Sequence, residues 1–314
     1  MLVSGNWAPL LTPGLREIYS MVAGRPDPMR DMLYRVLPST KSAEEYLGMG
    51  GRRLIPTWTG TVPYEDMDAY YRVNMRNVLL VDGLAIERSL LEDDQYGQIR
   101  QAGEAHAEGF ATTREHDAVQ TLINAFTDSG VNRIGLNIAG ADAVGLCSTA
   151  HPYSPVQSGT TQSNEGTLAL SVANADTTRQ LMLNYTDDKG VLMAVNPDEI
   201  WVPAELEREA RQIFPQTDDV LFEPGSAQFD ANLFQSKVGG HRMKVVMWNR
   251  LTDANAWFMM DSKLRKQHLI WQERVLPTFE ELPMVNPEIA QWSGRMRYSL
   301  GWTHWAWVHG QNPS

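Results

Sequence analysis

The segment that most constrains the fold is residues 48–84, which are rich in aromatic side chains, glycines and prolines. A glycine-rich start at 48–53 leads into 54–64, which holds two prolines, and the aromatic and β-branched stretch 70–81 follows. We predict a long two-stranded hairpin over these residues, with its turn near 65–69. Because a lone hairpin is only marginally stable in water, this one needs a larger surface to lie on.

The side chains of this segment predict contacts between copies of the chain. An extended arm has little core of its own in which to bury large aromatic rings, and it is too long to fold back. The alternative, that the rings pack on the body of their own chain, stays open. The predicted interface residues are Trp58, Tyr64, Tyr70, Tyr71, Arg52, Arg53, Arg72 and Arg76.

Residues 1–47 predict an arm of short pieces. Thr12 and Pro13 are typical of a helix start, Asp27-Pro28 repeats that signal, and Ser42 with Glu45 matches a capping box. Each piece is too short to be stable alone in water. We therefore expect each to pack on the body of the chain or on a neighbour.

The longest helical pattern covers residues 95–127. Apolar and small side chains recur there at intervals of three and four residues, and Asp128-Ser129-Gly130 ends the pattern. Residues 143–164 then contain no Asp, Glu, Lys or Arg, and the Ser, Thr, Gln and Gly content of residues 153–167 predicts a surface loop.

The rest of the chain predicts mixed α/β structure. We expect a helix capped by Asn174 or Asp176, a buried strand at 200–202 and a helix from Pro203 to Phe214. Further on we expect strands at 244–248 and 257–260, a half-buried strand at 295–302, and a bulge or bend near Thr303 and His304.

Composition narrows the function further. The 314 residues carry a formal charge of −11, which argues against a protein that grips nucleic acid through phosphates. Such a charge suits a container wall facing DNA, and it also suits plain solubility. With a single cysteine, no signal peptide pattern and no apolar run of membrane-span length, the chain is expected to be made in a cytoplasm, without a membrane partner.

No constellation of residues predicts catalysis or a cofactor. Cys147 and His151 lie four residues apart in a loop, but catalytic pairs usually come from distant segments. His106 and His116 are ten residues apart and do not share a helix face, as metal ligands would. We therefore predict no catalytic residue, no metal and no cofactor, and we interpret these residues as structural.

Two stretches resemble the major head subunits of Mu-type tailed bacteriophages. They are Ile86-Glu87-Arg88-Ser89-Leu90-Leu91-Glu92-Asp93-Asp94-Gln95-Tyr96-Gly97, just before the long helix, and Leu146-Cys147-Ser148-Thr149-Ala150-His151-Pro152. The order of the parts also resembles that family. The resemblance implies the α+β HK97-like capsid fold, with an N-terminal arm (1–47), an extended loop (48–84), a peripheral domain with a long spine helix (85–165 and 263–314) and an axial α/β domain (166–262).

The resemblance also implies a function that is geometric. Identical chains would form hexamers and pentamers that close an icosahedral shell around double-stranded DNA, with a portal, a scaffolding protein and in some cases a decoration protein as partners. Because only a short arm precedes the loop, we expect the scaffolding protein to be a separate chain. Residues 48–84 contain no lysine and the chain has one cysteine, so we expect a shell without covalent links.

Three other functions compete with this interpretation. An encapsulin, a cellular shell around cargo enzymes, shares the fold, and neighbouring genes would separate the two. A cytoplasmic α/β enzyme would need a pocket of convergent polar groups, for which the chain offers only the Cys147 and His106 sets. A decoration protein of a virion is usually smaller than 314 residues.

Overall fold

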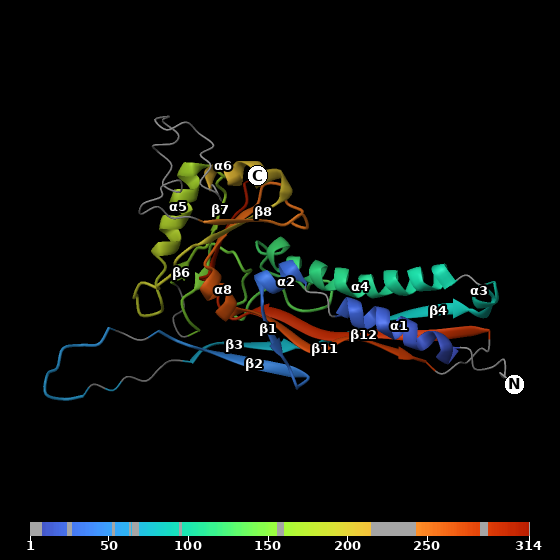
Figure 1. Cartoon of the computed structure of the whole chain (residues 1–314). Helices are drawn as coiled ribbons and strands as arrows, with labels where there is room; N and C mark the ends of the chain where they lie inside the picture. The colour runs from blue at the N-terminus through green and yellow to red at the C-terminus, as the bar shows by residue number, and fades with distance from the viewer. Residues whose placement is uncertain are drawn as a thin grey trace.

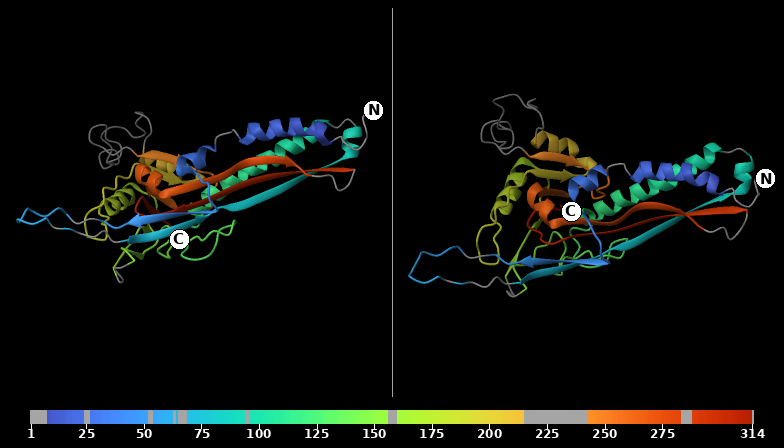
Figure 2. Two further views of the ribbon diagram at one scale, coloured as in Figure 1. Left: turned by 90° about the horizontal axis from the view of Figure 1, so that it is seen from below. Right: turned by 60° about the horizontal axis from the view of Figure 1, so that its bottom comes forward.

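A computed structural model of the chain has an elongated part built on a four-stranded sheet, a second part built on a five-stranded sheet, and a loop that projects from the body (Figure 1). The further views in Figure 2 show the same elongation and the same projecting loop. The structure describes residues 8–23, 27–51, 54–62, 64, 69–93, 96–155, 160–214, 243–282 and 288–313. In that part of the chain no helix is long and apolar enough to cross a membrane.

The elongated part is a sheet with the strand order β1-β11-β12-β4. Its strands are β1 (Arg35–Pro38), β4 (Val78–Glu87), β11 (Leu269–Glu281) and β12 (Ile289–Trp302). β1 is parallel to β11, and the other pairs are antiparallel. Side chains along β12 alternate between buried and more exposed, as predicted for a half-buried strand.

Two long helices cover one face of this sheet. α4 (Tyr96–Ile123) confirms the predicted long helix, and α1 (Ala8–Ala23) packs against α4 and β11 (Figure 1). At Gly294 of β12 an added Cβ would lie 2.6 Å from the Phe110 ring of α4, so sheet and helix are in close contact there. The short helix α3 (Arg88–Glu92) connects β4 toward α4.

The second part is a sheet with the order β7-β13-β10-β8-β9. Its strands are β7 (Glu165–Gly166), β8 (Glu199–Val202), β9 (Lys244–Met247), β10 (Trp257–Met260) and β13 (Val308–Gln311). The helices α5 (Val172–Leu183) and α6 (Glu207–Ile213) contact this sheet, and the short helix η1 (Ala204–Leu206) precedes α6. The helix α8 (Ser262–His268) follows β10 and contacts β1 and β11 of the four-stranded sheet. Every residue of β8, β10 and β13 is buried. The predicted strands at 200–202, 244–248 and 257–260 are therefore confirmed.

The bend predicted near Thr303 and His304 is where the chain changes sheets. β12 ends at Trp302 in the four-stranded sheet, and β13 begins at Val308 in the five-stranded one. β13 thus lies beside strands that the predicted boundaries assign to the axial domain, although they assign β13 itself to the peripheral domain. The division into domains stays a prediction.

The hairpin predicted within 48–84 is wrong in its strand pairing. β2 (Ala43–Met49) pairs with β3 (Ala69–Arg76), and residues 78–81 belong to β4 of the long sheet. Residues 54–62 form no strand, because Pro56 lacks an N–H and the segment has no partner within the described chain. Asn77 separates β3 from β4, and its amide donates to Ser39 Oγ and the Lys41 carbonyl at 2.8 and 2.9 Å.

The N-terminal pieces are partly as predicted. α2 (Pro28–Leu33) begins at the predicted Asp27-Pro28 signal. The start predicted at Thr12 is wrong, because α1 already begins at Ala8 and contains Pro13. The capping box at Ser42 is also wrong, since pairing with β3 makes residues 43–49 a strand. Further along, the helix predicted to have Asn174 or Asp176 as its cap is α5, but its cap is Ser171, three residues before Asn174, and it begins at Val172.

Buried charges hold α2 to the body of the chain. Asp27 lies 3.0 Å from both Arg30 and Arg114, and the guanidinium of Arg114 in α4 lies 3.5 Å from Glu273 in β11. Burial raises the pKa of Asp27 above its usual value, and this effect outweighs the opposite effect of Arg114 and Arg30. A buried network of this kind needs every partner in place, so residues 27–38 are part of the folded body.

Candidate assembly surfaces

Residues 54–62 and 64, here called the loop tip, extend away from the body into solvent (Figure 1). Ile55 is 90% exposed, Trp58 71% and Tyr64 92%, and Leu54 and Val62 are exposed as well. Soluble monomers rarely leave a contiguous apolar segment uncovered. The predictions for Trp58 and Tyr64 therefore fit a surface that another chain covers. The sequence reasoning missed Leu54, Ile55 and Val62, although the lack of charge from 54 to 62 is a usable signal.

The root of the loop packs on its own chain. Tyr70 stacks on His304 with ring centroids 5.6 Å apart, and Tyr71 contacts Tyr70 edge-on at 5.0 Å. Burial raises the pKa of Tyr70. Just after β2, the Gly51 amide donates to the Asp188 carboxylate at 2.6 Å. For Tyr70 and Tyr71 the own-chain alternative is therefore at least partly right, and their role between copies stays a prediction.

The predicted arginines are dispersed rather than gathered. Arg72 and Arg76 are exposed on β3, and Arg72 lies 3.8 Å from Glu45 of β2. Arg52 and Arg53 lie outside the described residues. An exposed pair such as Arg72 and Glu45 contributes little to stability, so Arg72 is free to contact a partner.

A second apolar surface lies on the face of the long sheet opposite α4. Leu79 and Val81 of β4 are more than half exposed, and their β12 partners are Arg297 and Arg295. Neighbouring β4 side chains such as Ile86 point to the buried face, because alternate residues of a strand face opposite sides. The sequence analysis did not single out this strip.

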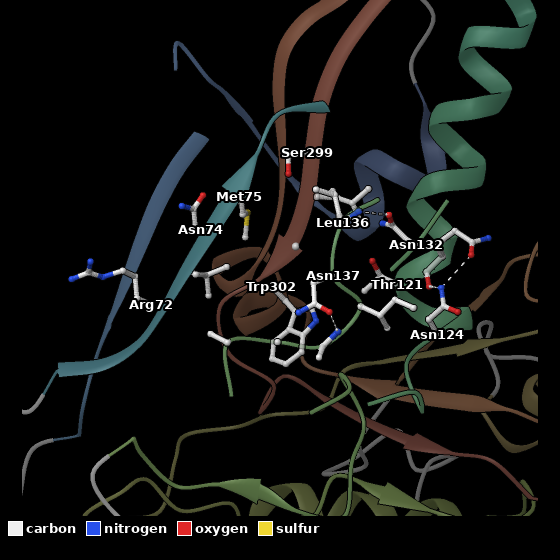
Figure 3. A pocket seen from close by; sticks show the side chains of 18 residues that line it. Arg72, Asn74, Met75, Thr121, Asn124, Asn132, Leu136, Asn137, Ser299 and Trp302 are labelled. Carbon is white, nitrogen blue, oxygen red and sulfur yellow. Dashed lines mark hydrogen bonds between the residues drawn. The ribbon is translucent and has the colours of Figure 1, made fainter. Parts of the chain in front are cut away.

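A cavity of about 210 Å³ lies at the root of the loop (Figure 3). β3 forms one wall, the end of α4 and the loop 132–141 form the other, and the end of β12 closes it. The lining is rich in amide side chains and apolar groups, and Arg72 is its one charged residue. The residues labelled in Figure 3 are Arg72, Asn74, Met75, Thr121, Asn124, Asn132, Leu136, Asn137, Ser299 and Trp302.

Cys147 and His151 are built into the core. Both are buried, and burial raises the pKa of the Cys147 thiol well above its usual value. The ring of His151 stacks on Trp305 at 4.6 Å, and its Nδ1 lies 2.7 Å from Asp142. A thiol that stays protonated and out of solvent is a poor nucleophile, which supports the structural interpretation of this loop.

The histidines of α4 do not converge with other ligands. His106 Nε2 lies 3.2 Å from Asp82 Oδ2, and His116 Nδ1 lies 3.5 Å from Asp117 Oδ1. Within the described ranges, no group of three or more His, Cys, Asp or Glu side chains is arranged to hold a metal.

Comparison with known proteins identifies the family. A family model for phage capsid proteins matches residues 82–309. Three solved structures have similar folds. The capsid of a native GTA particle has a TM-score of 0.56 at 10% identity, over 92% of this chain and 91% of that one. The mature capsid of bacteriophage PhiM1 has a TM-score of 0.53 at 12% identity, over 91% and 86%. Mycobacterium phage Patience has a TM-score of 0.55 at 8% identity, over 99% and 88%.

These comparisons differ in what they establish. No curated protein matches the sequence. The structural matches are all far below 25% identity, so they show the fold, which is the predicted HK97-like capsid fold of the α+β class. The family match covers well over half of the chain. The chain therefore belongs to the phage capsid protein family and is a structural component of a virion.

Proposed function

We propose that this phage capsid protein builds its icosahedral head from hexamers and pentamers of identical chains, around double-stranded DNA. The observation that carries the proposal is the exposed loop tip. Its large apolar side chains have no cover within the described chain, although the rest of the chain has a well-buried core. A shell supplies the missing cover, because each copy then lies next to others.

Burial of the loop tip would contribute substantially to assembly. Covering a large apolar side chain contributes on the order of 1.5–3 kcal/mol, and Leu54, Ile55, Trp58 and Tyr64 are all exposed. Much of this offsets the entropy lost on association. Each copy in a ring gives one such contact and receives another, so modest contacts add up over a closed shell.

The strip at Leu79 and Val81 is a suitable receiving surface. It is exposed, apolar and flanked by Arg295 and Arg297, and it lies on the sheet face that α4 leaves uncovered. We propose that part of the neighbouring copy's loop lies along it. The absence of lysine from residues 48–84 supports a shell held together without covalent links through this loop.

Several finer assignments belong to the same proposal. The motifs at 86–97 and 146–152 support a Mu-type head subunit. That relationship implies a scaffolding protein, a portal, packaged DNA without sequence-specific contacts and, in some heads, a decoration protein. The buried thiol of Cys147 supports a structural rather than an enzymatic role. The encapsulin alternative is tested by the neighbouring genes, since terminase and portal genes accompany a head subunit.

Particle formation tests the proposal directly. The purified chain, alone and with the candidate scaffolding protein, would be sized by light scattering and viewed by negative-stain electron microscopy. We expect round shells, or hexamers and pentamers that await the scaffold. A chain that stays monomeric or dimeric in both conditions would contradict the proposal.

A further inference from the structure

We propose that the cavity at the root of the loop, here called the loop-root cavity, receives Trp58 from the loop tip of a neighbouring copy. This inference rests on the proposed shell and names one contact that would hold it together. Four observations carry it, namely the open strand edge in the cavity wall, the size and lining of the cavity, the chemistry of the loop tip, and the direction in which the loop projects.

The cavity wall includes a strand edge that is free to pair. The four consecutive residues 72–75 of β3 all line the cavity. Because successive side chains of a strand face opposite sides, Met75 points toward the cavity whereas Arg72 and Asn74 point away from it (Figure 3), so the backbone of β3 forms part of the wall. In the described part of the chain β3 pairs with β2 alone, so its other edge is open. An open edge offers backbone donors and acceptors to an added strand.

The size and lining suit an indole ring. A dry cavity of about 150 Å³ is large enough to bind benzene, and this one is about 210 Å³. Leu136, Ile138 and Leu300 supply apolar contacts. An indole N–H needs an acceptor when it is buried, and the amide oxygen of Asn137 in the wall can supply one, because it accepts from the Ala139 amide at 3.3 Å and has a second lone pair.

The loop tip has the pattern of a strand that lacks a partner. Residues 57–62 lie between Pro56 and Pro63, contain no charge, and place a threonine at every second position, at 57, 59 and 61. Trp58 and Val62 fall on the opposite face, as period-two alternation requires. Proline lacks an N–H and limits a strand at its ends, which would confine pairing to these six residues. The segment is exposed throughout and forms no strand in the single chain.

The partner must be another copy. Trp58 is 71% exposed, and Figure 1 shows its segment extending away from the body and from the root of its own loop. The tip of one chain and the root of the next are different surfaces, so the contact is head-to-tail. Head-to-tail contacts form rings when the rotation closes, as hexamers and pentamers require.

Photo-cross-linking from position 58 tests the contact. Trp58→p-benzoylphenylalanine keeps an aromatic ring and reacts with whatever lies beside it. Shells would be assembled from a mixture of isotopically heavy and light chains, irradiated and digested. We expect heavy-to-light cross-links from position 58 to peptides that contain residues 72–75, 132–141 or 299–302. The same substitution at Leu181, which is exposed on α5, is the control and should give none of these.

The outcomes separate this inference from the proposed function. Shells that form but cross-link position 58 to the strip at Leu79 and Val81, or elsewhere outside the cavity, would overturn the cavity contact and leave the shell intact. Failure of the unmodified chain to form shells would refute the proposed function itself.

A double-mutant comparison gives a second, independent readout. We expect Trp58→Ala to raise the concentration needed for assembly at least tenfold and Asn137→Ala to raise it about threefold, with Leu181→Ala unchanged. Asn137 is exposed in the loop 132–141, so its truncation should leave the subunit folded. If Asn137 acts on Trp58, Asn137→Ala should have almost no further effect in the Trp58→Ala background. Full additivity of the two effects would contradict the contact.

Discussion

Asp117 is the residue whose replacement should most clearly separate helix packing from assembly. It lies in α4, is 1% exposed, and accepts hydrogen bonds from Arg133 at 2.8 and 2.6 Å and from the hydroxyl of Tyr298 in β12 at 2.5 Å. The Tyr298 ring stacks on Trp271 at 4.5 Å. Asp117 therefore connects α4 to β12 of the sheet through Tyr298, and to the loop after α4 through Arg133.

The structure gives the expected magnitude of this change. A hydrogen bond to a charged group contributes about 1.5–3 kcal/mol, and a buried hydroxyl left without a partner costs about 1–3 kcal/mol. Arg133 is 43% exposed at its side chain, so water can replace its lost partner. We therefore expect Asp117→Ala to lower the free energy of unfolding by about 3–4 kcal/mol. Arg133→Ala should cost a similar amount, about 3 kcal/mol, because it leaves the buried Asp117 carboxylate without its two-pronged partner.

Urea unfolding of the unassembled subunit measures these effects. Tryptophan fluorescence is a suitable signal because Trp271 lies against Tyr298. The cycle of Asp117→Ala, Tyr298→Phe and the double variant should give a coupling free energy of about 1.5–3 kcal/mol. A coupling below about 0.5 kcal/mol would refute the claim that this hydrogen bond joins α4 to β12.

Three further predictions follow from buried groups. Burial lowers the pKa of His304 to about 3 and of His309 to about 4, from 6.5. Below pH 6.5 the unfolded chain therefore binds more protons than the folded chain, and the free energy of unfolding should fall by up to about 1.4 kcal/mol per pH unit per histidine between pH 6.5 and about 4. Urea titrations at several pH values measure this slope, which His309→Gln should reduce. Cys147 should resist a thiol reagent in the native chain and react at once in urea, and rapid native labelling would contradict its burial. Gly294→Ala should destabilise the chain by about 1–3 kcal/mol, because its Cβ would meet Phe110 at 2.6 Å, whereas Gly83→Ala, 3.8 Å from the nearest atom, should change the urea midpoint little.

Local patterns predicted those parts of the fold that depend on local interactions. The spacing of apolar residues around Ile99 and Phe110 predicted α4, and the β-branched and aromatic run at 200–202 predicted β8. The resemblance at 86–97 and 146–152 added the capsid fold, which the solved structures confirm. Periodicity alone gave elements but not their arrangement, because sheet order depends on contacts between distant residues.

The misplaced hairpin shows where local reasoning fails. Ser42 and Glu45 have the spacing of a helix cap, yet 43–49 pairs with 69–76 across a loop of some twenty residues. No local signal specifies such a pairing. The candidate site shows the same limit of local reasoning. Trp58 was predicted from composition, but the cavity at the loop root depends on β3, α4 and β12 meeting in space.

The location of uncovered apolar surface explains why this chain suits assembly. Its tryptophans at 201, 257, 271, 292 and 307 are fully buried, whereas Trp58 is exposed on a loop with no core of its own. A folded body needs no help from Trp58, so a change at 58 should alter assembly and leave the urea midpoint of the subunit unchanged. A change at Asp117 should instead lower the urea midpoint of the subunit first, because it weakens the body that carries the loop-root cavity. Finding that Trp58→Ala unfolds the subunit would therefore contradict the assignment of the loop tip to contacts between copies.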